Sequence, residues 1–284
     1  MRLTPCSIRA SGYEMLKSPP VVLAFIVFAL VVFAACAAPW LAHVDPTALD
    51  PAARLRKPFT DAMLGTDAFG RDVWSRVVYG ARVSLIAGLG AALLSVTIGL
   101  VLGVLAGAFR FLDGIIMRTM DALMAIPGIL LAIALVSVTG ASVTTVLIAI
   151  TLPEIPRVVR IVRAQILSVW HEPFVEAAVA LGTPTPWILW RHMIPNTLAP
   201  LTIQATYVFA SAIITEAILS FLGAGIPPEI PSWGNMMADG RMYFRLLPGL
   251  ILFPGLALSL TVLSVNLLGD ALRDALDPKM EQRP

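Results

Sequence analysis

The stretch VSLIAGLGAALLSVTIGLVLGVLAGAF, residues 83–109, contains no charged side chain. Because about 20 apolar residues span the hydrocarbon core of a bilayer as a helix, this stretch predicts a membrane-spanning helix. Its small residues recur at every fourth position and so share one helix face: Ala87, Ala91, Ser95, Gly99, Gly103 and Gly107. Small residues let two helix backbones approach closely in lipid, so this is a predicted helix-packing face. Packing within the chain and contact with a partner subunit both fit the pattern, and we favour the former.

The whole chain has the composition of a polytopic membrane protein. Of its 284 residues, 58% are hydrophobic and 13% are charged, whereas soluble domains have about 25% charged residues. Hydrophobic segments cover residues 21–42, 83–109, 122–138, 142 to about 161, 198–222 and 246–268. Backbone exposed to lipid must satisfy its own hydrogen bonds. The sequence therefore predicts an all-α bundle of six transmembrane helices, of which the fourth is short and broken near Pro153 and Pro156.

The distribution of Lys and Arg predicts the orientation of the bundle. Six spans place both termini on one side, and twelve of the 20 basic residues flank the spans on that side, including Arg157, Arg160 and Arg163. Cytoplasmic loops carry an excess of basic residues. We therefore expect cytoplasmic termini and a long extracytoplasmic first loop.

A polar segment, FVEAAVALGTPTPWILWRHMIPNT, residues 174–197, separates the fourth and fifth spans on the same side as the termini. Glu172-Pro173 is a typical helix start, and Gly182 is a typical left-handed helix end. A second helix is expected to begin at Thr185-Pro186 and to stop at Pro195. The helix-turn-helix either docks into a groove of another protein or lies on the membrane surface. A surface helix would carry Lys or Arg on its polar face, and the first helix has neither.

The same segment resembles the "EAA" loop of ABC-importer permeases. The match comprises Glu176, Ala177 and Ala178, then Gly182, then Ile194 and Pro195. The resemblance implies that this loop is a coupling helix that docks in a cleft of a cytoplasmic ATPase subunit. His192 stands where the family usually has isoleucine, which is similar to the peptide branch of these permeases.

Three longer motifs extend the resemblance to nearly the whole chain. LGTDAFGRDVWSRVVYGARVSL (64–85), EAILSFLGAGIPPEIPSWGNMMADGR (216–241) and NLLGDALRDALDPK (266–279) resemble the dipeptide/oligopeptide/nickel class, in particular its "C"-type member. The resemblance implies a cytoplasmic tail (1–20), a first span with a long outer loop (21–82), a permease core (83–268) with coupling loop 171–195, and a second cytoplasmic tail (269–284). An acid at Glu154 departs from the family pattern, and we interpret it as a partner of Arg157.

The resemblance also implies the partners. A homologous permease, most simply in a heterodimer, would supply the other half of the pathway, and two ABC ATPase subunits and an extracytoplasmic solute-binding protein would complete a transporter in the bacterial inner membrane. Peptides, nickel and glutathione are solutes of this class. No nucleic-acid partner and no cofactor is implied.

The residues themselves argue against an enzyme. A phosphate-binding loop needs Gly-Lys-Ser/Thr, but Leu, Arg and Pro precede Lys17, Lys57 and Lys279. The three histidines are scattered and suggest no metal site. Glu216 lies within the fifth predicted span, where a carboxylate is either a pathway residue or a helix-packing residue. An ion-coupled secondary transporter is the alternative function; it would show inverted repeats and broken helices around an acidic site.

Overall fold

The computed structural model describes residues 18–60 and 62–276. Most of the predicted tail 1–20 and residues 277–284 of the second predicted tail lie outside the described residues.

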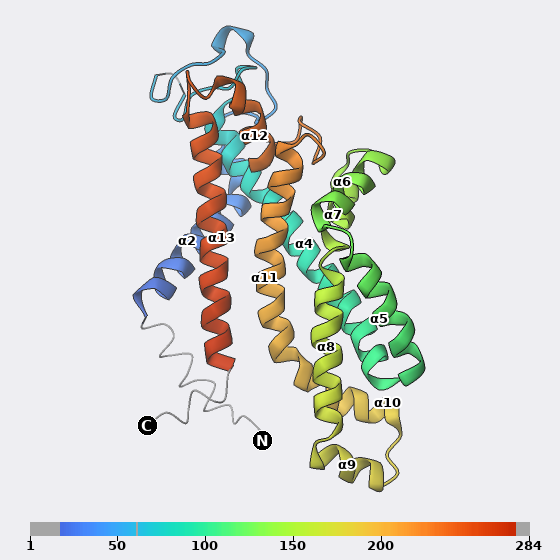
Figure 1. Ribbon diagram of the computed structural model, residues 1–284. Coiled ribbons are helices and arrows are strands. Elements are labelled where there is room, and N and C mark those ends of the chain that lie inside the picture. The colour runs from blue at the N-terminus through green and yellow to red at the C-terminus, as the bar shows by residue number, and fades with distance from the viewer. Residues whose placement is uncertain (1–17, 61, 277–284) are drawn as a thin grey trace.

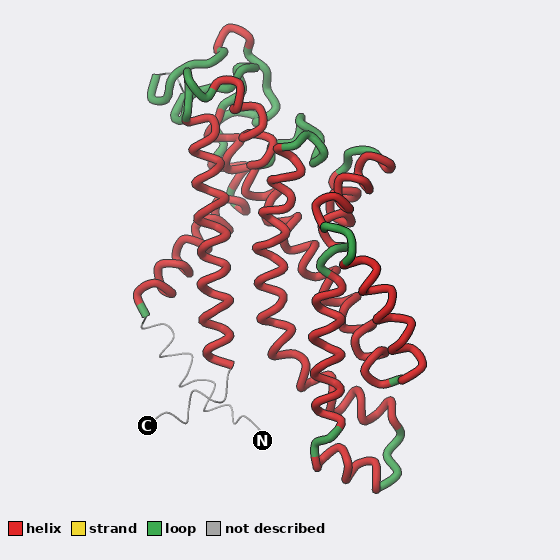
Figure 2. The backbone as a smooth tube through the Cα atoms, viewed as in Figure 1, coloured by secondary structure: helices red, strands yellow, loops and turns green. Residues whose placement is uncertain are grey.

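The described residues form helices and loops without a β-strand, which confirms the all-α class. The helices are α2 (Pro19–Cys36), α3 (Ala38–Leu41), α4 (Val73–Ala108), α5 (Arg110–Met124), α6 (Gly128–Thr139), α7 (Val143–Thr151), α8 (Ile155–Trp170), α9 (Pro173–Ala180), α10 (Thr185–Ile188), α11 (Ile194–Phe221), α12 (Trp233–Gly240) and α13 (Gly249–Leu276). Short 3₁₀ turns, η1 (Pro51–Ala53) and η3 (Arg241–Tyr243), and a π-helical turn, η2 (Leu189–Met193), complete the set. Figure 2 shows the loops gathered at the two ends of the bundle and at breaks between helices.

Four of the described helices are long and apolar enough to cross a membrane: α2, α4, α13 and the continuous helix Thr185–Phe221. The pair α5 and α6 makes a fifth if it is taken as one bent span. A polytopic helical membrane protein is thus confirmed, while the count of six spans stays a prediction.

The third predicted segment, residues 122–138, is not one helix, and this expectation was wrong. α5 ends at Met124, and α6 begins at Gly128 after a bend of 87°. Pro127 lies at the bend and explains it, because a proline disfavours helical backbone at the preceding residue and has no N–H to donate. The expected break in the fourth segment is present, since turn residues 152–154 separate α7 from α8.

α4 is longer than the sequence indicated. It begins at Val73 rather than near residue 83, and the Asp72 carboxylate accepts a hydrogen bond from the backbone N–H of Ser75 at the start of the helix. Such a cap stabilises a helix start. Because α4 begins before residue 83 and α13 continues to Leu276, the predicted boundaries at 82/83 and 268/269 fall inside helices.

The small residues of α4 lie against α8 of the same chain. A Cβ atom built on Gly99 would lie 2.5 Å from the Cβ atom of Val158, and one built on Gly103 would lie 2.6 Å from that of Val162. A Cβ on Gly107 would lie 2.7 Å from the Cβ atom of Ile166. Val158, Val162 and Ile166 are fully buried. The two backbones therefore approach as closely as only glycine permits.

The chain outside the long helices gathers at two opposite ends of the molecule (Figure 1). The segment 42–72 lies beside α12 at one end, and α9 and α10 project from the other. α2 begins and α13 ends toward the side of α9 and α10. This agrees with the predicted placement of the long first loop opposite the 174–197 segment.

We expect Gly103→Leu to separate α4 from α8 and to lower the free energy of unfolding by about 1–3 kcal/mol, the typical cost of overpacking. The measurement is the thermal unfolding midpoint of the detergent-solubilised protein, followed by tryptophan fluorescence. Gly114→Leu on α5 is the matched control, because nothing lies within 4 Å of a Cβ atom built there. Equal midpoints for the two variants would contradict the close α4–α8 contact.

Candidate functional site

The predicted coupling segment forms a compact hairpin at one end of the molecule. α9 starts at Pro173, where the backbone N–H of Val175 donates to the carbonyl of Glu172 at 2.9 Å. It ends at Ala180, and Gly182, two residues later, has a φ of +74° in the left-handed region. The N–H groups of Gly182 and Thr183 donate to the carbonyls of Val179 and Ala178 at 2.9 and 3.1 Å. This pair of bonds is a Schellman motif, so Gly182 ends α9 in the expected way.

The residues of α9 divide between a packed face and an exposed face. Val175 is fully buried, and Ala178 packs in part against the cluster that contains Ile188 and Met193. Glu176 and Ala177 are exposed. Val179 is 51% exposed, and Leu181, one residue after the helix, is 86% exposed. The Glu-Ala-Ala triplet thus presents Glu176 and Ala177 outward, while Ala178 faces its own chain.

The second helix does not stop at Pro195, and this expectation was wrong. α10 begins at Thr185 with Pro184, not Thr185, as its cap residue, and it continues through η2 into α11. Pro195 lies in the first turn of α11. Pro195 has no N–H to donate to a carbonyl of the preceding turn, and that turn is the π-helical η2.

The hairpin is joined to the bundle on both sides. Ile194 and Ala178 pack against the same buried cluster, which also contains Ile166 of α8 and Leu201 of α11. The rings of Phe174 and His192 lie 5.9 Å apart and connect the start of α9 to η2. Pro195 and Gly182 are exposed. Ala178 and Ile194 thus pack against one buried cluster, while the remaining predicted coupling residues are at the surface: Glu176, Ala177, Gly182 and Pro195.

Glu216 lies in the interior of the bundle. It is fully buried on α11, and its carboxylate accepts a hydrogen bond from the Ser220 hydroxyl at 2.8 Å and a long one from Ser84 of α4 at 3.5 Å. These contacts are of the kind that the helix-packing alternative requires. A pathway role for Glu216 stays a prediction.

The arginines of α8 are paired with carboxylates, which sequence reasoning foresaw only for Arg157. Arg157 Nη1 lies 3.4 Å from Glu154 Oε2. Arg160 Nη2 lies 2.7 Å from Asp121 Oδ1, and Arg163 Nη2 lies 2.7 Å from Asp113 Oδ2. Asp113 and Asp121 belong to α5, so two ion pairs join α5 to α8. No local sequence pattern marks these two pairs, because their partners lie 39 and 50 positions apart in the chain.

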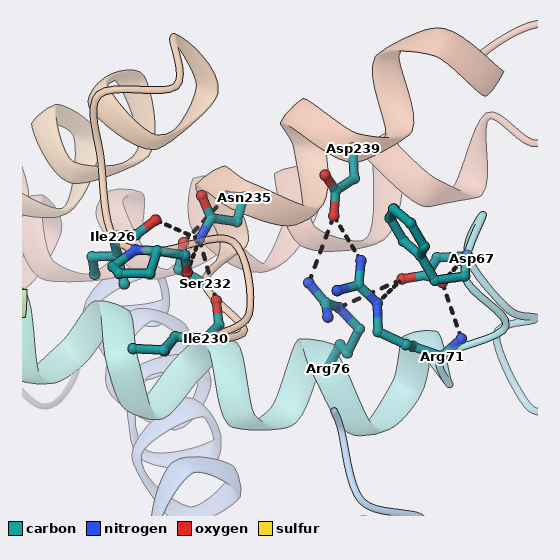
Figure 3. A network of polar contacts seen from close by, with 10 residues as sticks. Asp67, Arg71, Arg76, Ile226, Ile230, Ser232, Asn235 and Asp239 are labelled. Carbon is teal, nitrogen blue, oxygen red and sulfur yellow. Dashed lines mark hydrogen bonds and ion pairs between the residues drawn. The ribbon is translucent and has the colours of Figure 1, made fainter. Parts of the chain in front are cut away.

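A buried group of charges at the end of the molecule opposite α9 was also not predicted from the sequence. Figure 3 shows Arg71 and Arg76 between Asp67 and Asp239. Arg71 Nε lies 2.6 Å from Asp67 Oδ2, and Arg71 Nη2 lies 2.8 Å from Asp239 Oδ2. Arg76 is 1% exposed and lies 3.8 Å from the same two carboxylates. Two positive and two negative charges thus join the 42–72 segment to α4 and α12.

The side-chain amide of Asn235 holds the loop before α12 by hydrogen bonds. The side-chain N–H₂ group of Asn235 donates to the carbonyls of Ile226 and Ile230 at 3.0 and 3.2 Å (Figure 3). Trp233 is buried, and its indole N–H donates to the carbonyl of Val77 on α4 at 3.0 Å. α12 is therefore fixed to α4 by contacts that no local sequence pattern indicates.

Comparison with known proteins gives one family and several relatives. Residues 95–282 match the family described as "Binding-protein-dependent transport system inner membrane component". A probable peptide ABC transporter permease protein of Sinorhizobium fredii is 51% identical over 239 residues, which cover 84% of this chain and 82% of that protein. The dipeptide transport system permease protein of Alkalihalophilus pseudofirmus is 40% identical over 274 residues (96% and 90%). The glutathione transport system permease protein of Pectobacterium atrosepticum is 42% identical over 225 residues (79% and 75%).

We expect Asp67→Asn to destabilise the end of the molecule that contains the 42–72 segment. The change leaves two arginines facing one carboxylate, and breaking a buried ion pair costs about 3 kcal/mol or more. Limited proteolysis within residues 42–72 and the thermal unfolding midpoint measure the effect. The control is Glu229→Gln, because Glu229 is exposed. If both variants resist protease like the parent protein, Asp67 is not needed to hold this segment.

Proposed function

Because this chain belongs to the family of binding-protein-dependent transport system inner membrane components, we propose that it is the permease subunit of an ATP-driven importer whose ATPase docks on α9. It is similar over most of its length to peptide and dipeptide ABC transporter permeases. A small peptide or a related solute such as glutathione is therefore the proposed cargo, and nickel is the further candidate of the same class.

One observation supports the proposed coupling to an ATPase: α9 exposes apolar residues although it lies outside the long apolar helices. Ala177 and Ala180, three residues apart on one side of α9, are exposed, and so is Leu181 directly after the helix. The only charge in α9 is Glu176, and α9 has no Lys or Arg. A helix lying on an anionic membrane would need basic residues on its polar face. A small apolar helix face is instead suited to a groove of another protein. We propose that this groove belongs to the ATPase subunit.

The packing of the hairpin supports a mechanical role. A force on α9 acts on Val175 and Ala178, which pack against residues of α8, η2 and α11. α8 is in turn packed against the glycines of α4 and paired by charge with α5. Movement of α9 would therefore displace several helices together. In the proposed cycle, ATP binding draws the two coupling helices of the transporter toward each other and opens the pathway outward, and hydrolysis resets it.

The remaining partners follow from the same proposal. One chain would form half of the pathway, with a homologous permease as the other half and two ATPase subunits beneath. The 42–72 segment and α12, at the end opposite α9, would face the extracytoplasmic solute-binding protein. Catalysis of ATP hydrolysis is assigned to the ATPase subunits, and both termini to the cytoplasm.

The test is a charge placed on the exposed face of α9. Ala177→Asp should abolish co-purification of the ATPase subunits and ATP-dependent uptake, because an unpaired charge buried in an interface costs several kcal/mol. A loss of about 3 kcal/mol weakens binding by more than a hundredfold. The thermal unfolding midpoint should not change, since Ala177 is exposed. Ala178 is less suitable, because it packs against its own chain.

Ala141→Asp is the matched control, an exposed alanine in the loop between α6 and α7. Retention of ATPase subunits and uptake in Ala177→Asp would remove the coupling role of α9. Uptake that follows an ion gradient and does not require ATP would favour the secondary transporter instead.

A further inference from the structure

A cavity of about 310 Å³ lies where two helices are interrupted. Its wall includes Pro127 at the bend between α5 and α6, and Pro153 at the break between α7 and α8. α11 contributes Ser211 and Thr215 to the wall. Figure 1 shows the breaks between α5 and α6 and between α7 and α8 about midway between the two ends of the molecule. Ligand pockets for small molecules start at about this size.

The polar group in this cavity that is largely withdrawn from solvent is the carboxylate of Glu154. Glu154 is 9% exposed and is the last residue of the break 152–154 before α8. The Ser211 hydroxyl donates to Glu154 Oε1 at 2.9 Å, which fixes the carboxylate against α11. A carboxylate has about four acceptor positions, so this bond leaves acceptor capacity open.

Arg157 neutralises Glu154 only weakly. Its Nη1 atom lies 3.4 Å from Glu154 Oε2, which is a single long contact and not a two-bond pair. Strong arginine–carboxylate pairs make two parallel bonds at about 2.7–2.9 Å. The Arg157 side chain is 60% exposed, so it can turn to solvent when another cation takes its place. A partly buried carboxylate in this state attracts a positively charged group.

We propose that this cavity is a solute subsite, in which the Glu154 carboxylate binds a primary ammonium group of the transported solute. The inference rests on the proposed transport function and adds a chemical requirement to it: the solute carries a free amino group, as the N-terminus of a peptide does. A metal ion fits the site less well, because among the described residues no three His, Cys, Asp or Glu side chains come together. The ammonium group would donate to Glu154, while Arg157 turns toward solvent.

The competing explanation is that Glu154 and Ser211 merely link α8 to α11. Glu229 provides a comparison, since it is exposed in the loop before α12 and absent from the wall of this cavity. Replacement of either glutamate by glutamine removes one carboxylate and keeps the shape of the side chain. A subsite and a structural link therefore predict different results for the two variants.

The first experiment measures the charge preference of the cavity with Thr215→Cys in the full transporter, purified with its partners in lipid nanodiscs. A thiol-reactive methanethiosulfonate carrying an ethylammonium group is compared with one carrying an ethylsulfonate group, and modification of residue 215 is followed by peptide mass spectrometry. We expect the ammonium-to-sulfonate rate ratio to fall about tenfold in Glu154→Gln. Glu229→Gln should leave the ratio unchanged, because Glu229 lies outside the cavity wall. An unreactive Cys at 215, or an unchanged ratio in Glu154→Gln, would overturn the proposal.

The second experiment asks whether an amino group occupies the site. Dialanine should slow the ammonium reagent at residue 215 at least threefold, whereas N-acetyl-dialanine at the same concentration should not. Dialanine should give no protection in Glu154→Gln. Equal protection by both compounds, or by neither, would overturn the inference.

ATP-dependent uptake of dialanine by the same preparation in proteoliposomes is measured separately. Uptake without selective protection at residue 215 refutes the subsite and leaves the proposed function standing. Selective protection without ATP-dependent uptake refutes the proposed function and leaves the subsite standing.

Discussion

Along the contact between α4 and α8, each of three glycines four residues apart lies against a branched side chain, and no larger residue than glycine fits. In a membrane the apolar surface of a helix gains little by leaving lipid, so association depends on close van der Waals contact. The Gly99–Val158 and Gly103–Val162 contacts supply it. The position of α8 then determines where α9 projects, where the break at 152–154 lies and which carboxylates its arginines reach.

α8 supports two regions of the structure, the hairpin that contains α9 and the cavity beside Glu154. The lower part of α8 packs with α9, η2 and α11 around Val175, Ile188 and Met193. Its upper end carries Glu154 toward Ser211 of α11. Because both regions are attached to α8 and α11, a shift of these helices relative to each other changes the hairpin and the cavity together. In the proposed function, docking at α9 would therefore reach the proposed solute subsite through α8 and α11.

Features with a periodic or local signal could be predicted from the sequence. The apolar lengths indicated the class, the four-residue spacing indicated the glycine face, and Gly182 indicated the end of α9. The bend at Pro127 was missed although the proline itself indicates a break, because the apolar run continues across it. The helix continues through Pro195 by means of a π-helical turn, and no simple sequence pattern predicts that turn. Contacts between distant segments, such as Ser211 with Glu154 and Asp239 with Arg71, require the three-dimensional arrangement. The sequence thus predicted which segment forms the candidate site. Which residues of that segment face outward is determined by packing in the three-dimensional structure.

The ion pairs of the α8 arginines bear on the electrical work of moving α8 in the membrane potential. Arg157, Arg160 and Arg163 each lie beside a carboxylate, of Glu154, Asp121 and Asp113 respectively, so the three pairs sum to no charge. Moving one elementary charge through the membrane potential involves about 2.3 kcal/mol per 100 mV. In the proposed cycle, a movement of α8 together with α5 would carry Arg160 and Arg163 with their counter-charges on α5, and the electrical work on these two pairs would cancel. The membrane potential would therefore neither drive nor oppose this movement through these two pairs.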